Sequence, residues 1–433
     1  MAIVDERALK GAGSLAKIDR VAFLFFSFQI TVLIFLQKFG LPAAGSVVEL
    51  VFFTIWAGIG ALAVIGVLRF DVVRLALYSV FAAFAIVAHL ILGRSFSAPS
   101  LLQILALYLP LCLSFRVSQA TYERCMRLFV NIMIFFAFIV FLQHSLQYTI
   151  GPQYWINLDK LVPTEFLFKN YTYQRLMQWG LPYIKPNVVL FLEPSILSQF
   201  LALAKIVEIL SFRRVWVLSV LMLAQLLTFS GTGLILIAIC APFILARLPA
   251  RWVALITAAS FAGLLVLTAT GYIAAMLSRI SEFQTVGSSA YERFLAPILE
   301  IRKMITDNRS IFVGIGAGNL SESDRENQIH WASVKCMAEY GFLTFLMFHV
   351  FLIYSLFSGS PNRILALALI FTYSFLGGAF GVPMYAMTVM LLGTFLRLRE
   401  DQTSSDSRFR PVNDAWLFRI GKQREGRWPP KAS

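Results

Sequence analysis

Long apolar segments alternate with short polar turns from residue 21 to residue 396 of the chain. Because a helix needs about 20 mostly apolar residues to cross a bilayer, roughly a dozen of these segments are candidate transmembrane helices. Their approximate ranges are 21–37, 44–68, 75–92, 101–115, 128–149, 188–212, 215–229, 232–246, 252–277, 331–357 and two within 364–396. The pattern predicts an all-α, polytopic membrane protein of about 12 transmembrane helices. We expect one transmembrane domain over residues 1–396 and a basic cytoplasmic tail over 397–433.

Two long polar stretches interrupt this pattern, at about 150–187 and 279–330. Loops of this length in a compact protein are usually functional or unstructured. The second mixes Tyr291, Phe294 and Ile305 with its charges, so we expect it to fold back onto the protein. Lys and Arg gather on alternate short loops, which predicts that both termini lie in the cytoplasm and that both long loops face the periplasm or the cell exterior.

The composition excludes a soluble protein, since the mean hydropathy is +0.75 and only 14% of residues are charged. The net charge of +14 could suggest nucleic acid. In a membrane protein, however, it reflects excess Lys and Arg on cytoplasmic loops, so we expect no nucleic-acid partner. The four cysteines fall in or beside apolar segments without close spacing, so we expect small buried side chains, no metal site and no disulfide framework.

Ionisable residues inside apolar segments are costly, so each is a functional candidate. Glu193 lies in Phe191-Leu192-Glu193-Pro194-Ser195, where we place it one to two turns inside the outer end of segment 188–212. A carboxylate there could hold a sugar hydroxyl or orient an arginine, or it could be a buried acid that stabilises the bundle. His330 and Glu339 flank the start of segment 331–357, where a histidine could act as base or hydrogen-bond donor. An ordinary interfacial histidine is the alternative.

Cations gather in both long loops, on the side predicted to be periplasmic. They include Arg175 and Lys185 in the first loop and Arg293, Arg302 and Arg309 in the second. Guanidinium groups bind phosphate oxygens in bidentate fashion. Two facing loops of this kind suit a diphosphate headgroup at the membrane surface, although acids in the second loop also permit a merely solvated surface.

Two glycine patterns are not read as functional motifs. Gly314-x-Gly316-x-Gly318 lacks the strand–helix–strand context of a dinucleotide site. The stretch 230–233, Ser-Gly-Thr-Gly, is not a hydrolase nucleophile elbow and more simply marks a tight turn between two short helices.

The order of several short stretches between roughly 165 and 345 resembles the O-antigen polymerase and O-antigen ligase superfamily. These stretches are Lys185-Pro186-Asn187, Phe191-Leu192-Glu193-Pro194-Ser195, Leu227-Thr228-Phe229-Ser230-Gly231-Thr232-Gly233, Tyr291-Glu292-Arg293, Phe312-Val313-Gly314-Ile315-Gly316, and His330 with Glu339-Tyr340-Gly341. Two positions depart from the family pattern, because Lys185 and Gly231 stand where the family usually has arginine. Arg175 is a candidate substitute for the first.

The resemblance implies a metal-independent, GT-C-like glycosyltransferase of the bacterial inner membrane. Its donor would be a glycan on undecaprenyl diphosphate, and a flippase and a chain-length regulator would be pathway partners. Arg293 and a cation of the first loop would hold the diphosphate, His330 would activate the acceptor hydroxyl, and Glu193 and Glu339 would orient these groups. The Glu-Pro-Ser turn favours a polymerase of lipid-linked repeat units. The alternatives are a ligase that transfers the glycan to lipid A core and a transporter of lipid-linked sugars.

Overall fold

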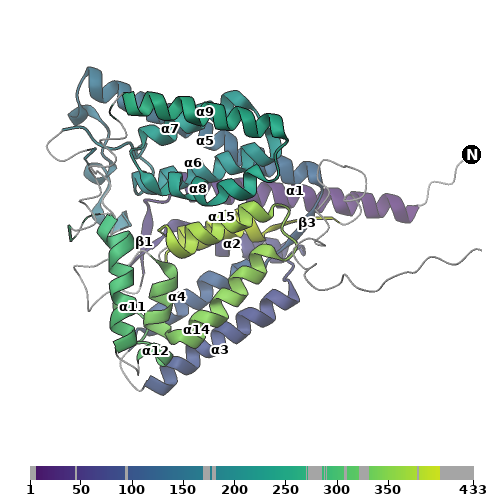
Figure 1. Ribbon diagram of the computed structural model, residues 1–433. Helices are drawn as coiled ribbons and strands as arrows, with labels where there is room; N and C mark the ends of the chain where they lie inside the picture. The colour runs from purple at the N-terminus through teal and green to yellow at the C-terminus, as the bar shows by residue number, and fades with distance from the viewer. Residues whose placement is uncertain are drawn as a thin grey trace, which may run out of the picture.

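The computed structural model describes residues 6–43, 46–92, 96–168, 176–177, 182–269, 271, 285–286, 288, 290–306, 310–320, 331–377 and 380–399. Most of these residues are helical, and the helices run between two ends of a bundle (Figure 1). The α-helices are α1 (Glu6–Phe35), α2 (Leu50–Val64), α3 (Val72–Leu92), α4 (Ala98–Tyr108), α5 (Gln119–Thr149), α6 (Pro194–Val207), α7 (Val215–Leu227), α8 (Gly231–Leu245), α9 (Ala250–Ala269), α11 (Ala296–Thr306), α12 (Ser310–Val313), α14 (Ala332–Phe357), α15 (Arg363–Phe375) and α16 (Pro383–Val389).

Short 3-10 and π-helical turns connect or extend these helices. They are η1 (Leu109–Cys112), η2 (Pro152–Tyr154), η3 (Leu158–Lys160), η4 (Thr164–Phe166), η5 (Glu208–Phe212), η7 (Tyr291–Leu295) and η8 (Met390–Thr394). The turns η2, η3 and η4 lie in the first long polar stretch, and η7, α11 and α12 lie in the second. Both stretches are therefore at least partly ordered.

Six helices of the described chain are long and apolar enough to cross a membrane, which makes the chain a multi-pass membrane protein. They span Leu15–Phe35, Val72–Ile91, Gln119–Thr149, Pro194–Phe212, Ala250–Ala269 and Ala332–Phe357. The other apolar segments form helices of 10–17 residues. In segment 44–68, for example, residues 46–49 form a strand and the helix begins only at Leu50.

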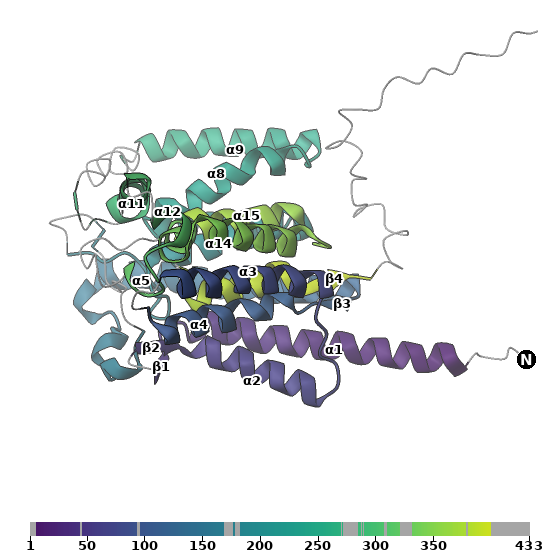
Figure 2. The same cartoon turned by 90° about the horizontal axis from the view of Figure 1, so that it is seen from below.

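The fold is mostly α rather than entirely α, because two pairs of short strands close the ends of the bundle. Strands β1 (Gly40–Ala43) and β2 (Ser46–Glu49) form an antiparallel hairpin between α1 and α2. Strands β3 (Phe115–Val117) and β4 (Leu396–Leu398) pair in parallel. Figure 2 shows β1 and β2 at one end with α11, and β3 and β4 at the opposite end. The hydrophobic pattern did not reveal these strands, since three or four residues are too few to show alternation.

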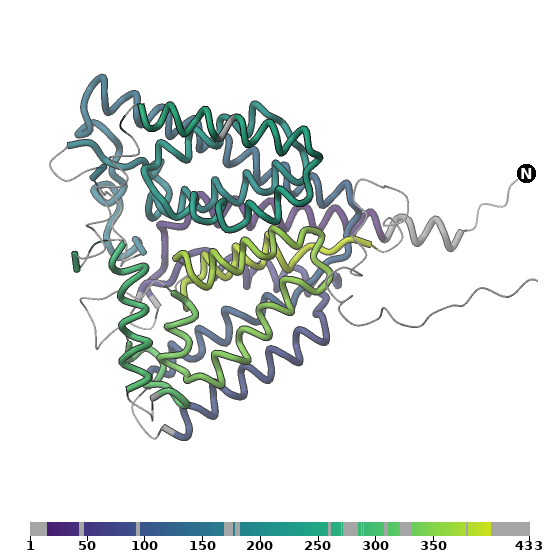
Figure 3. The backbone as a smooth tube through the Cα atoms, in the orientation of Figure 1, coloured from purple at the N-terminus to yellow at the C-terminus, as the bar shows by residue number. Residues whose placement is uncertain are grey.

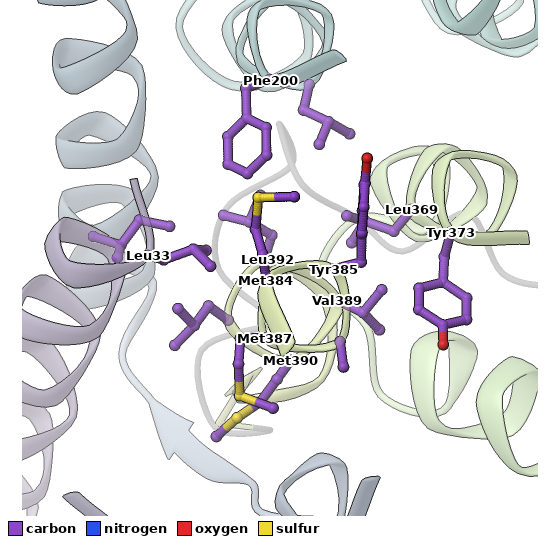
Figure 4. Packing of buried hydrophobic residues seen from close by; sticks show 14 of the residues in the cluster. Leu33, Phe200, Leu369, Tyr373, Met384, Tyr385, Met387, Val389, Met390 and Leu392 are labelled. Carbon is purple, nitrogen blue, oxygen red and sulfur yellow. The ribbon is translucent and has the colours of Figure 1, made fainter. Parts of the chain in front are cut away.

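Helix α6 occupies the centre of the bundle. All of its side chains are buried, and its neighbours include α5, α7, α8 and α15. The buried set includes four polar residues, Ser195, Ser198, Gln199 and Lys205. The backbone trace in Figure 3 shows this middle part of the chain running beside the last helices. Figure 4 shows one part of the core, where Phe200 of α6 faces Met384 and Leu392 of the last helical segment, with Leu33 of α1 alongside.

A buried arginine fastens the β3–β4 end. Arg74 of α3 is 1% exposed, and its guanidinium donates to the carbonyls of Leu111, Thr394 and Ser358 at 3.3, 2.8 and 3.3 Å. These carbonyls come from chain positions up to 320 residues away. Buried carbonyl groups need hydrogen-bond donors, and this one guanidinium supplies them to carbonyls at the ends of several elements. All four cysteines are free and buried, as the sequence indicated.

Candidate functional site

A buried arginine and a buried glutamate meet at the end of the bundle opposite β3 and β4. The Nη2 atom of Arg293 donates to Oε2 of Glu193 at 2.5 Å and to Oγ of Ser195 at 2.8 Å. The Ser195 hydroxyl in turn donates to Oε2 of Glu193 at 2.8 Å. Arg293 and Glu193 are 3% and 2% exposed, so both charges are removed from water. Each charge therefore offsets part of the cost of burying the other.

The sequence explains why Glu193 stands at this point. Pro194 occupies the first position of α6, where its missing N–H is not needed, and Glu193 is the residue before the helix. The prediction that Glu193 lies one to two turns inside a helix is therefore wrong, because residues 188–193 are not helical. Its carbonyl accepts from Ile196 and Leu197 and so starts the helix, while its side chain is left to bind Arg293.

Three glutamines, two on α5 and one in the turn after α1, hold the irregular segment that leads to Glu193. Gln147 exchanges two hydrogen bonds with the backbone of Ile184, Gln143 accepts from Val188, and Gln37 accepts from Leu192. Val188 and its neighbour Val189 have φ of 47° and 67°, a region that β-branched residues avoid. The glutamine contacts offset this strain and fix the approach to the site.

Helix α8 supports the same turn from the other side. Its Thr232 donates to the carbonyl of Ser195 at 3.1 Å, and Ser198 donates to the carbonyl of Ser230 at 3.2 Å. A Cβ on Gly233 would lie 2.2 Å from the carbonyl oxygen of Ser198, so only glycine permits this close approach of the two helices. A tight turn does separate the two helices, as predicted, but it lies at residues 228–230, because residues 231–233 already form the first turn of α8.

Arg293 keeps two nitrogens free for another group. Within the described part of the chain, its Nε and Nη1 are buried without a hydrogen-bond partner. A Cβ on Gly377 would lie 3.7 Å from Nη1 of Arg293, 3.2 Å from Nε2 of Gln199 and 3.3 Å from the Tyr385 hydroxyl. The side chains of Arg293, Gln199 and Tyr385 therefore surround one point next to Gly377, which has no side chain of its own. Figure 4 shows the Tyr385 ring extending from α16 toward the helix that carries Phe200.

Gln199 is fixed in this polar group, which we call the Arg293 cluster (Glu193, Ser195, Gln199, Arg293 and Tyr385). Its amide nitrogen donates to the carbonyl of Leu376 at 2.7 Å, while its oxygen has no partner among the described residues. The cluster thus contains buried donors, Nε and Nη1 of Arg293, and a buried acceptor, Oε1 of Gln199, that have no partner among the described residues. An unmet buried polar group costs about 1–3 kcal/mol, so such an arrangement is suited to a polar ligand.

Glu49 lies behind the last helix at the same end of the bundle. Its Oε2 accepts from the amide of Met384 at 2.6 Å, at the start of α16. Complete burial raises the pKa of Glu49 to about 8, and the Met384 hydrogen bond acts in the opposite direction. Glu49 therefore helps to place the helix that carries Tyr385.

Glu339 belongs to a separate arrangement. Helix α14 breaks at Gly341, which has φ 81° and ψ 167°, so the carbonyls of Ala338 and Glu339 are available to accept from Ile315 and Gly316. The Glu339 carboxylate lies 3.8 Å from Nζ of Lys335. No hydrogen bond or ion pair between described residues joins Glu339 to Arg293.

The glycines at 314, 316 and 318 make this docking possible. All three have positive φ, and a Cβ on Gly314 would lie 2.5 Å from the backbone of Glu339. The pattern therefore serves chain packing, in agreement with setting it aside as a nucleotide motif. Met304 and Leu320 also pack against Val334 and Ala338, so the described part of the second long stretch folds back onto the protein as predicted.

The remaining candidate residues do not all lie near the Arg293 cluster in the described part of the chain. Lys185 is buried in the segment held by the glutamines, and Arg302 is exposed on α11. His330, Arg175 and Arg309 lie outside the described residues. Sequence reasoning missed Gln199 and Tyr385, because neither is charged. The available signal was Gln199 following Ser195 by four residues, which places both on one face of a helix.

The fold and the Arg293 cluster define a multi-pass membrane protein with a buried polar site at one end of its helical bundle. A family model described as WcaD colanic acid polymerase matches residues 31–357, which is more than half of the chain. The chain belongs to this family. It is therefore a polymerase of lipid-linked repeat units of an exopolysaccharide. No curated protein and no solved structure gives a significant match.

The family assignment confirms the prediction of a repeat-unit polymerase. It favours neither the ligase that would transfer a glycan to lipid A core nor the transporter of lipid-linked sugars.

Proposed function

We propose that the enzyme joins repeat units carried on undecaprenyl diphosphate, with the Arg293 cluster binding the diphosphate that leaves. The observation that carries this proposal is the guanidinium of Arg293, which is buried, oriented through Nη2 and open at Nε and Nη1. Buried, preorganised donors of this kind can stabilise charge that develops on phosphate oxygens, because they need no reorganisation at the moment of reaction. The sugar–phosphate bond is already activated, so positioning and charge stabilisation account for the reaction without a metal ion or cofactor.

Glu193 neutralises Arg293, so a diphosphate needs further cations nearby. Lys185, Arg175, Arg302 and Arg309 are the candidates, of which Lys185 is the one in the buried segment leading to Glu193. The Tyr385 hydroxyl and the Gln199 amide, which surround the same point as Arg293, would bind the oxygen atoms that the guanidinium does not reach.

The acceptor would be activated from the other polar arrangement. His330 stands one residue before Trp331, which immediately precedes α14. We assign it the role of base or hydrogen-bond partner for the acceptor hydroxyl. Glu339, with Lys335 and the docked glycine segment, would fix the broken helix beneath it.

The proposed orientation places both termini in the cytoplasm and the Arg293 end at the periplasmic face of the inner membrane. It requires about 12 crossings, in which the shorter apolar helices also span the membrane. The domain limits stay as proposed, with a transmembrane domain over 1–396 and a basic tail over 397–433. A flippase would deliver the substrate, and a chain-length regulator would be a further partner. An impermeant thiol reagent should label Ser288→Cys in intact cells whose outer membrane is permeabilised; labelling only after lysis would contradict the orientation.

A reconstituted assay tests the function directly. Wild-type protein in proteoliposomes should convert undecaprenyl-diphosphate repeat units into a ladder of polymers, whereas a ligase would leave single units unchanged. His330→Ala should retain wild-type thermal stability but polymerise at least about a hundredfold more slowly. A wild-type rate for this variant would remove His330 from the mechanism.

A further inference from the structure

A basic pocket lies at the β3–β4 end of the bundle, far from the Arg293 cluster. It has a volume of about 390 Å³ and is lined by the start of α1, the turn between α2 and α3, and β3. Figure 2 shows these elements at the end opposite β1, β2 and α11. The volume is within the range of small-ligand sites. We call it the basic pocket and define it by Lys17, Arg69, Arg116 and Arg399.

The acids of this end are already engaged by other groups. Asp19 accepts from Arg399 at 2.5 Å and from Thr121 at 3.2 Å. Asp71 binds Arg397 at 2.6 Å and accepts from the Arg74 amide, contacts that help to keep the pKa of its carboxyl below the usual value despite partial burial. Neither carboxylate is therefore available to neutralise further cations.

Three cations of the pocket are left without an acid. Within the described ranges, Lys17, Arg69 and Arg116 form no ion pair and their side chains make no hydrogen bond. Their side chains are exposed to solvent, yet they converge on one concave site. Like charges brought together in this way repel each other unless an anion lies between them.

The walls of the pocket are fixed rather than adaptable. Arg116 is paired with Arg397 in the β3–β4 ladder, and the amide of Phe115 donates to the carbonyl of Phe395 at 2.8 Å. Arg399 is held by Asp19 and by the carbonyl of Leu15. The backbone that carries Arg116 is therefore fixed before an anion binds, whereas the exposed side chains of Lys17, Arg69 and Arg116 lose rotamer freedom on binding.

Apolar side chains complete the lining. Leu15, Ile18, Ile65 and Val67 stand beside the cations, and the pocket lies at the ends of membrane-crossing helices. Such a mixture suits a phosphate group attached to an apolar body at a membrane surface. In the orientation of the proposed function, on which this point rests, that surface is the inner leaflet.

We propose that the basic pocket binds a phosphate group, from an anionic lipid headgroup or from a soluble phosphate, as a second anion site separate from the substrate site. Lys17, Arg69 and Arg116 bind the phosphate oxygens, and the adjacent aliphatic side chains contact the carbon atoms attached to them.

The test measures binding to purified full-length protein by native mass spectrometry, with dioleoylphosphatidylglycerol as the lipid probe and inorganic pyrophosphate as the soluble probe. The double variant Arg69→Gln/Arg116→Gln should weaken binding about fivefold for each cation removed. The matched control is Arg247→Gln/Arg251→Gln, which removes the same charge beside α8 and α9. Retained lipid that pyrophosphate cannot displace assigns a lipid headgroup, and displacement by pyrophosphate assigns a soluble phosphate.

Equal losses in the two double variants would overturn the proposal, because they would show diffuse attraction to surface charge. Truncation after Arg399 provides a second check. If either probe binds only once residues 400–433 are removed, the chain's own acidic residues fill the pocket and the proposal fails. Binding is measured without turnover, so a failed polymerisation assay would leave this result unaffected. The Ser288→Cys labelling separately tests the orientation.

Discussion

Arg293 and Glu193 are 100 residues apart in the chain, yet their charged ends lie 2.5 Å apart in the interior of the protein. The contact joins the second long polar stretch to the start of the central helix α6. The contact uses only Nη2 of the guanidinium. Glu193 therefore fixes the position of the arginine while Nε and Nη1 can still donate to another group.

Removal of Arg293 should separate stability from activity. Arg293→Ala should slow polymerisation at least about a hundredfold, because a preorganised donor to the leaving group is lost. It should also destabilise the protein by about 3–5 kcal/mol, since Glu193 is left buried without its partner. Arg293→Lys should rescue activity poorly, because a point charge lacks the planar set of donors.

A double variant distinguishes the two effects. Arg293→Ala combined with Glu193→Ala removes both charges and should recover much of the thermal stability while remaining inactive in the proteoliposome assay. If the double variant polymerises at the wild-type rate, Arg293 has a structural role only.

The Tyr385 hydroxyl should contribute to substrate binding. Tyr385→Phe should raise KM for the lipid-linked repeat unit about three- to tenfold, in proportion to one lost hydrogen bond. Tyr373→Phe is the matched control, because this buried hydroxyl is bonded to Tyr108 instead. Equal effects of the two substitutions on KM would show that the Tyr385 hydroxyl does not bind the substrate.

The break in α14 should tolerate no side chain. A Cβ on Gly341 would lie 2.1 Å from the carbonyl oxygen of Phe312, and the residue has φ of 81°. Gly341→Ala should therefore lower the free energy of unfolding by about 1–3 kcal/mol or more. Gly60→Ala is the control, since nothing lies within 4 Å of a Cβ there. Thermal unfolding in detergent would compare them, and an equal melting temperature for both variants would refute the docking argument.

Stability should depend on pH through Glu49. Burial raises its pKa from the usual value of 4.5 to about 8 in the folded protein, so the folded state holds a proton that the unfolded state releases. The folded state is then favoured at low pH, and its stability falls by up to about 1.4 kcal/mol per unit as the pH rises from 4.5 toward 8. Glu49→Gln should remove this decline. Melting curves at several pH values would show parallel declines for both proteins if the assignment is wrong.

The sequence predicted the membrane class, the folding back of the second polar stretch and a tight turn between α7 and α8, although the turn lies at 228–230 rather than at 230–233. It also singled out both Arg293 and Glu193. It could not predict that they meet, because a contact across 100 residues depends on packing rather than on local pattern. Helix α6 begins later than predicted, because residues 188–192 are apolar but form a partly left-handed turn that three distant glutamines hold. Tyr385 and Gln199 carry no charge, so polarity in an apolar segment was too weak a signal to identify them.

The carbonyls that accept from Arg74 also determine when its hydrogen bonds can be completed during synthesis of the chain. Arg74 enters the membrane with α3, but one of its acceptors, the carbonyl of Thr394, is made 320 residues later. Until the ribosome has synthesised Thr394, this guanidinium has only part of its final set of partners. The β3–β4 end of the bundle therefore cannot be completed before residues 394–398 have been made.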